Sequence, residues 1–331
     1  MSTAVAPRAA VPRRRRLLAG SVFAVLGLAA AVLGVNAGQF DGHGITPAQA
    51  FVIDQLLLPR VLTALLAGAA LALAGAVFQS VTRNPLGSPD VLGFTQGAAT
   101  GALVGVTWFG GGTLAVACGG WLGAVGSAAA VYLPARRGGV TGGTRLVLVG
   151  IGVAAMLAGV DEYLLTRANV TDAAQASQWI IGSLDGASWS SVVLLAGATA
   201  LPAPVLLLAS RALGVLELGD DLATGLGLPA ERARLLALGG AVLLAATAAA
   251  QTGPVAFVAL VAPHLARRLT RRTGPNLLPS LLLGAALLAW ADYAGQHAIP
   301  GRELPVGVIT GVLGGGYLVY LLARQRRSGL I

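Results

Sequence analysis

The stretch Leu216-Glu-Leu-Gly-Asp-Asp-Leu-Ala-Thr-Gly-Leu-Gly-Leu-Pro-Ala-Glu-Arg-Ala-Arg-Leu235 interrupts a chain that is otherwise strongly apolar. It carries four carboxylates, at Glu217, Asp220, Asp221 and Glu231. The two aspartates can cap a short helix and offset the positive end of its dipole. Gly227 is a typical helix terminator, and Pro229 suits the first turn of a following helix. We therefore expect two short helical pieces with a kink between them, outside the bilayer and between two membrane spans. The plainer alternative is a solvated loop.

The composition is that of an integral membrane protein. Of 331 residues, 56% are hydrophobic and 11% are charged, whereas soluble domains carry about 25% charged residues. The formal net charge of +9 comes from arginine alone, because the chain has no lysine. A P-loop nucleotide site needs a lysine, so a Walker-type ATPase is excluded. Arginines that flank apolar spans are explained by membrane orientation, and we expect no nucleic-acid partner.

Few residues offer metal or proton chemistry. Cys118 is the single cysteine, so no disulfide can form within the chain, and the three histidines are scattered. We therefore expect no metal site. Asp161, Glu162 and Asp292 fall near the outer ends of predicted spans, where we expect water to reach them, and this position weakens a proton-relay role.

The apolar runs predict ten membrane-spanning helices, each needing about 20 apolar residues. Residues 1–15 form a basic cytosolic tail, and residues 16–331 form one transmembrane domain. The first run could be a cleavable signal peptide, but we expect an uncleaved span in a chain with many spans. The predicted spans are 17–35, 61–81, 91–109, 113–134, 145–166, 190–210, 235–252, 254–266, 276–295 and 305–323.

The turn signal Gln251-Thr252-Gly253-Pro254 separates the seventh and eighth spans. With ten passes and both termini in the cytosol, all but three of the 22 arginines fall in cytosolic segments. The exceptions are Arg60, Arg167 and Arg302. This distribution satisfies the positive-inside rule and supports the split.

Two connecting segments carry structure of their own. On the outside, Asp172 to Ile181 is amphipathic and is followed by Gly182, which predicts a short interfacial helix. On the cytosolic side, the segment from Arg83 to Gly93 contains two prolines and two glycines and predicts a rigid turn.

Several motifs follow one another along the chain: Leu58-Pro-Arg60, Gly68 to Gln79, Asn84 to Gly93, Trp179 to Leu184, Leu216 to Gly227, Gly253-Pro254 with Phe257, Val261 to His264, Ala291-Asp292 and Glu303 to Val308. In this order they resemble the iron-siderophore permeases of ABC importers, the family that includes the vitamin B12 permease. The resemblance runs from about residue 17 to residue 324. Within the family, Gly87 to Asp90, Leu218 to Asp221 and Val261 to Arg268 look closest to one of the two ferric-enterobactin permease subunits.

The resemblance implies an all-α permease of the ABC type II importer fold, with about ten transmembrane helices. It also implies a dimer around a central path, either with a second copy or with a paralogue. Two ATPase subunits would bind on the cytosolic side and an extracytoplasmic substrate-binding protein on the outside. The chain itself would be non-catalytic and bind no cofactor, since ATP and Mg²⁺ belong to the ATPase.

The resemblance also assigns residues. The coupling helices, about residues 216–228, would fit the ATPase. One of the four positions that would form the cytosolic gate, Gly143, departs from the family pattern, because many members have serine or threonine there. The outer face departs too: Leu57 and Gln296 stand where the vitamin B12 permease has arginines, and we expect Arg302 to replace the second. The coupling residues are Glu217, Leu218, Gly219, Asp220, Asp221, Ala223 and Gly227; the cytosolic gate is Asn84, Leu86, Gly143 and Thr144; the docking residues are Arg60 and Arg302.

The implied function is uptake of a ferric siderophore, catecholate by preference, across the bacterial cytoplasmic membrane. The first alternative is the same machine carrying haem or vitamin B12. An alternative of another class is an ion-coupled secondary transporter, which would need ionisable residues at mid-membrane and broken helices in matching halves. An intramembrane enzyme is disfavoured, because the predicted spans contain no His-Glu-x-x-His motif and no catalytic pair of aspartates.

Overall fold

The computed structural model describes residues 27, 46–110, 112–137, 140–141, 143–167, 180–299 and 302–327. The basic tail 1–15 lies outside these residues, as do nearly all of the first predicted span and most of the predicted interfacial helix.

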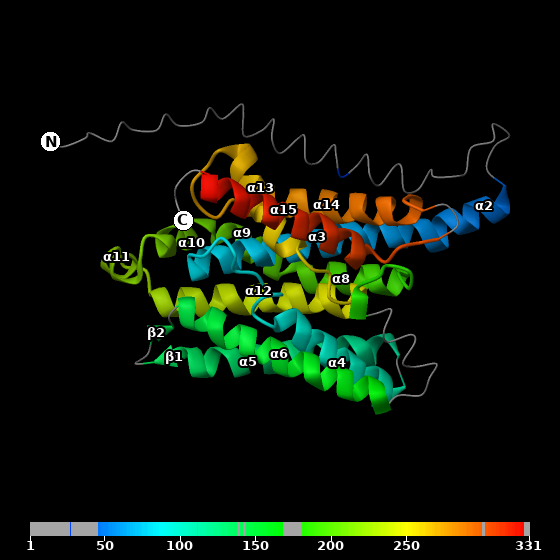
Figure 1. Cartoon of the computed structure of the whole chain (residues 1–331), viewed down its shortest axis with the longest axis horizontal. Coiled ribbons are helices and arrows are strands. Elements are labelled where there is room, and N and C mark those ends of the chain that lie inside the picture. The colour runs from blue at the N-terminus through cyan, green and yellow to red at the C-terminus, as the bar shows by residue number, and fades with distance from the viewer. Residues whose placement is uncertain are drawn as a thin grey trace.

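The described chain is a bundle of helices whose long axes run in roughly the same direction (Figure 1). The short helix α2 lies at one end of this bundle and α11 at the other. The helices are α2 Pro47–Val52, the π-helix η1 Ile53–Leu57, α3 Leu58–Thr82, α4 Phe94–Phe109, α5 Thr113–Ala135, α6 Gly143–Arg167, α8 Trp189–Ala200, α9 Pro202–Leu208, α10 Ser210–Glu217, α11 Asp220–Gly225, α12 Ala230–Thr252, α13 Val258–Thr270, α14 Leu277–His297 and α15 Val306–Arg327.

The helices agree with the hydropathy prediction. Each predicted span after the first coincides with a helix or a helix pair, and the predicted split falls between α12 and α13. Six described helices are long and apolar enough to cross a membrane by length and composition alone. The described chain is all-α except for a hairpin of two-residue strands, β1 Arg136–Arg137 and β2 Val140–Thr141.

Three boundaries differ from the prediction, each for a local reason. The span predicted at 190–210 is divided, because Pro202 starts a new helix after Leu201. Helix α12 begins at Ala230 rather than at 235, since polar residues extend its first turns beyond the apolar run. Helix α13 begins at Val258 rather than at 254, because Gly253 and Phe257 both have positive φ, at 67° and 68°.

Helix α3 is the centre of the core. It packs against α12, α13 and α14, and α12 lies between it and most of the layer of α4, α5 and α6 (Figure 1), although α3 also contacts α6 directly. Two helices approach most closely where a glycine leaves no side chain between their backbones. A Cβ atom added to Gly75 would lie 1.7 Å from the carbonyl oxygen of Ala259, so α3 and α13 touch through their backbones.

Two carboxylates are buried where water was expected to reach them. Asp161 is 3% exposed and Asp292 is 4% exposed, so that prediction is wrong for both, while Glu162 is exposed as expected. Each buried carboxylate has polar partners instead: Gln96 donates to Asp161, and Arg60 to Asp292.

Candidate functional site

The polar stretch that interrupts the apolar sequence forms a corner of three helices at one end of the bundle (Figure 1). Helix α10 ends at Glu217, α11 runs from Asp220 to Gly225, and α12 begins at Ala230. The turns between them use Gly219 and Gly227, with φ of 121° and 81°, which an L side chain rarely adopts. The predicted short helix and the kink after it are therefore confirmed, but the segment that follows the kink is the start of the long helix α12 and not a second short helix.

The role expected of the two aspartates in this corner is wrong in one respect. The N-cap of α11 is Gly219, and no side chain caps the helix. Asp220 and Asp221 occupy its first turn, where their charge still offsets the helix dipole. Pro229 is likewise the N-cap of α12 rather than part of its first turn.

Asp220 is held by two arginines from different helices. Arg234 Nη2 donates to both carboxylate oxygens, at 2.7 and 2.8 Å, and Arg83 Nη2 donates to Oδ1. Burial acts to raise the pKa of Asp220, but Arg234 and Arg83 outweigh it and hold this pKa below its usual value. The carboxylate is therefore ionised at neutral pH and links α11 to α12 and to the end of α3.

Further hydrogen bonds tie the same corner to α3. Ser80 Oγ donates to Glu217 Oε1 at 2.6 Å, and Arg83 Nε donates to the carbonyl oxygen of Leu216 at 3.0 Å. On the other side, Arg234 Nη1 donates to Glu231 Oε2 at 2.5 Å, and the Tyr132 hydroxyl of α5 donates to Oε1 of the same carboxylate. The corner is thus tied to two further helices of the bundle, α3 and α5.

The outward face of this corner is apolar. Leu218, Leu222 and Leu226 are 61%, 59% and 69% exposed, whereas Ala223 is fully buried against the bundle. Asp221 is exposed beside these leucines. Because the corner lies beyond the membrane-spanning helices, a row of exposed leucines indicates a contact with another protein. We call Leu218, Leu222 and Leu226 the coupling surface, after the role that the sequence predicts for this stretch.

The predicted gate residues lie at the ends of two helices. Asn84 and Leu86 follow α3 in a tight turn, where Asn84 Oδ1 accepts from the Leu86 backbone N–H at 2.9 Å. Leu86 is 49% exposed. Gly143 and Thr144 start α6, and Thr144 is exposed. Their assignment as a gate stays a prediction.

Arg60, a predicted docking residue, is engaged within the chain. Its guanidinium donates to Asp292 at 3.0–3.1 Å through Nε and Nη2, and Nη1 donates to Glu303 at 3.0 Å. Asp185 also lies 3.1 Å from Nη2, and the Arg60 side chain is only 15% exposed. Gln296, at the missing family arginine, donates to the Asp292 carboxylate at 2.8 Å. We call Arg60, Asp185, Asp292, Gln296 and Glu303 the outer cluster.

Arg302, the second predicted docking residue, is placed differently. Its side chain is exposed, and it forms no salt bridge within the described part of the chain. Its backbone pairs with Ile299 in an isolated bridge just before α15. Of the two arginines, Arg302 is therefore the one whose charge is available to a partner.

Sequence reasoning missed several residues of both sites. Arg83 and Arg234 were seen only as topology markers, yet they organise the corner around Asp220. The signal for Arg234 was present, since an arginine follows the aspartate within the same polar stretch. No comparable signal links Arg60 to Asp292, which is 232 residues away.

Comparison with known proteins decides the family. The model of the FecCD transport family matches residues 17–324, nearly the whole chain. The chain belongs to the FecCD transport family. This result confirms the resemblance inferred from the motifs, including its extent.

This FecCD chain is similar to two curated relatives and one solved structure over most of its length. The ferric enterobactin transport system permease protein FepG of Escherichia coli K12 is 44% identical over 277 residues, 84% of each chain. FepD of the same organism is 40% identical over 284 residues, 82% of each chain. A solved metal-chelate-type ABC transporter, in an inward-facing conformation, has a TM-score of 0.83 and 28% identity over 92% of this chain and 98% of its own. The all-α polytopic permease fold is thereby confirmed.

Proposed function

We propose that this chain is a permease subunit of an ABC importer that carries a ferric siderophore, a catecholate of the enterobactin type by preference. The similarity to FepG and FepD, both named for ferric enterobactin transport, supports this substrate class. The single observation that carries the proposal from family to mechanism is the coupling surface, an exposed apolar row fixed to the bundle by the Asp220 ion pairs. The chain does no covalent chemistry in this scheme.

The partners follow from this role. Two ATPase subunits, which bind ATP and Mg²⁺, contact the coupling surface from the cytosol. A substrate-binding protein docks at the opposite end of the bundle, near Arg302. A second permease, either another copy or a paralogue, completes the central path. The site is the bacterial cytoplasmic membrane, with multiple passes and both termini in the cytosol.

The contacts offer a route for the motion. A displacement of α11 pulls on Arg83 through Asp220, and Arg83 is the C-cap residue that directly follows α3. The next residues of the chain are Asn84 and Leu86, the proposed cytosolic gate. Movement of the ATPase would therefore reach the gate through one ion pair and one turn of backbone.

Transport by the reconstituted complex tests the function. Proteoliposomes would contain this chain, its permease partner and the ATPase, with loaded binding protein outside and ATP within. We expect accumulation of radioactive iron from ferric enterobactin that requires ATP and survives a protonophore. Haem and vitamin B12 serve as competing substrates. Accumulation that needs no ATP and stops with the protonophore would instead indicate an ion-coupled transporter.

A further inference from the structure

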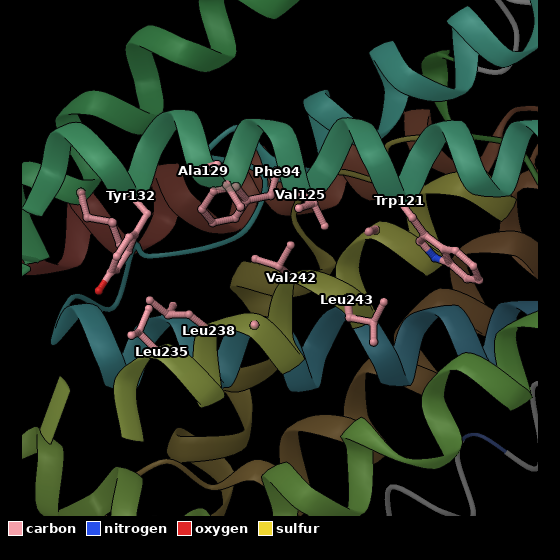
Figure 2. Close-up of a pocket in the computed structure, with 13 residues that line it drawn as sticks. Phe94, Trp121, Val125, Ala129, Tyr132, Leu235, Leu238, Val242 and Leu243 are labelled. Atoms are coloured by element: carbon pink, nitrogen blue, oxygen red, sulfur yellow. The ribbon is translucent and has the colours of Figure 1, made fainter. Parts of the chain in front are cut away.

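An apolar groove of about 290 Å³ lies between α5 and α12. Figure 2 shows Trp121, Val125 and Tyr132 on one side facing Leu235, Leu238 and Val242 on the other. Phe94 of α4 and Leu146 of α6 also line it. Aromatic, aliphatic and glycine residues supply the whole lining, so the groove is suited to a hydrocarbon.

The groove opens to the outside of the bundle. Three of its lining side chains are well exposed: Val125 at 59%, Leu235 at 42% and Leu243 at 38%. The chain neighbours of two lining residues, Leu122 next to Trp121 and Leu236 next to Leu235, are 74% and 78% exposed. In a membrane such a leucine-rich opening faces acyl chains, and an acyl chain can enter it from the side.

The length of the groove matches one leaflet. Trp121 and Tyr132 mark its two ends (Figure 2) and are eleven residues apart on α5, which corresponds to about 16 Å of helix. That is close to half of the roughly 30 Å hydrocarbon core of a bilayer. Trp121 Nε1 donates to Thr247 Oγ1 at 2.9 Å at the deep end. The Tyr132 end lies toward the coupling corner, through Glu231.

Three arginines lie close along the chain to residues at the Tyr132 end of the groove. Arg136, the C-cap of α5, donates its backbone N–H to the carbonyl oxygen of Tyr132. Arg232 precedes Leu235 by three residues on α12, and Arg145 adjoins Leu146 on α6. All three side chains are exposed, and none forms a salt bridge within the described residues. The acidic group nearby, Glu231, is already bound by Arg234 and Tyr132. The polar end of the groove is therefore cationic.

We propose that this groove binds one acyl chain of an anionic phospholipid, whose phosphate lies against Arg136, Arg145 and Arg232. Basic pockets between transmembrane helices on the cytoplasmic side are suited to anionic headgroups. The apolar lining supplies the affinity for the chain, and the arginines supply the preference for negative charge. This proposal rests on the proposed function in one respect only: the membrane orientation given there places the groove in the cytosolic leaflet.

Lipid binding to the full-length chain tests the proposal directly. Native mass spectrometry of the detergent-solubilised chain would compare phosphatidylglycerol with phosphatidylcholine of the same acyl composition. We expect one tightly retained phosphatidylglycerol, bound about tenfold more tightly than phosphatidylcholine. No ATPase, binding protein or siderophore is needed, so a failure of the transport proposal leaves this result unaffected.

Matched variants locate the site. A Cβ atom added to Gly239, which lines the groove, meets nothing within 4 Å, so the backbone there has room for a side chain and Gly239→Leu is chosen to occupy the groove. Gly197 of α8 is also exposed with open space around it, and Gly197→Leu is the control. We expect Gly239→Leu to reduce retention of both lipids and Gly197→Leu to leave both unchanged. Thermal unfolding in detergent checks that both variants fold.

A charge variant separates headgroup from chain. The triple change Arg136→Gln, Arg145→Gln and Arg232→Gln should lower phosphatidylglycerol retention to the phosphatidylcholine level. Parental lipid retention in a folded Gly239→Leu variant would overturn the proposal. It would also be overturned if Gly239→Leu instead abolished association with a second copy of the chain, because the groove would then be a protein interface.

Discussion

Arg234 of α12 donates two hydrogen bonds, at 2.7 and 2.8 Å, to the carboxylate of Asp220 in α11. The Arg234 side chain is 4% exposed, so water can replace little of what the Asp220 carboxylate supplies. Asp220 therefore has a structural role that a residue of a solvated loop would not have. It fixes the orientation of the coupling surface relative to the bundle.

Removing the charge of Asp220 should loosen α11. In Asp220→Asn, Arg234 keeps Glu231 but loses its other carboxylate, at a cost of about 1–3 kcal/mol. We expect faster proteolysis and faster hydrogen exchange in residues 218–228, with the transmembrane helices unaffected. Asp221→Asn is the matched control, because Asp221 is exposed. Equal loosening in both variants would show that the ion pairs do not hold the helix.

At the opposite end of the bundle, breaking an ion pair of the outer cluster should lower the stability of the whole fold. In Arg60→Met the Asp292 carboxylate, 4% exposed, keeps only Gln296 as a polar partner. Leaving a buried charge without its ion-pair partner typically costs about 3–5 kcal/mol, so the thermal midpoint in detergent should fall clearly. The double variant Arg60→Met with Asp292→Leu should recover most of the loss. No recovery would mean that Arg60 stabilises through other contacts.

Docking should depend on Arg302 without any effect on stability. Arg302→Glu reverses an exposed charge, so we expect slower association and weaker binding of the substrate-binding protein at low salt. The loss should shrink at high salt, because exposed charges are screened. The thermal midpoint should match the parent, unlike that of Arg60→Met. Parental affinity at low salt would remove Arg302 from the docking site.

Topology is tested by cysteine labelling. In a Cys118→Ser background, single cysteines at Thr141, Asp185, Gly274 and Gly301 sample four connecting segments. An impermeant thiol reagent should label positions 185 and 301 in intact cells, but not 141 or 274. Labelling at 274 would contradict the orientation beyond α12.

Hydropathy located the helices because a membrane span must be long and apolar whatever it packs against. The same rule could not place the start of α13, which depends on the positive φ of Gly253 and Phe257. The corner around Asp220 was predictable in outline, since its glycines and carboxylates lie in one stretch.

Tertiary relationships were beyond the sequence. Arg60 was expected to face a partner, yet it binds Asp292 on a helix that follows 232 residues later. The burial of Asp161 and Asp292 likewise depends on neighbouring helices. Their position near the ends of predicted spans suggested that water reaches them, but both side chains are buried. The groove between α5 and α12 exists only once the two helices are placed side by side.

The most direct test of the coupling role is the response of the ATPase to loaded binding protein in the reconstituted transporter. Leu222→Glu places a charge on the coupling surface, while Leu278→Glu, at an equally exposed leucine in the first turn of α14, is the control. We predict that Leu222→Glu inserts normally but loses most of the stimulation, and that Leu278→Glu keeps it. Stimulation of the Leu222→Glu complex equal to that of the parent would contradict the assignment of α11 as the coupling helix.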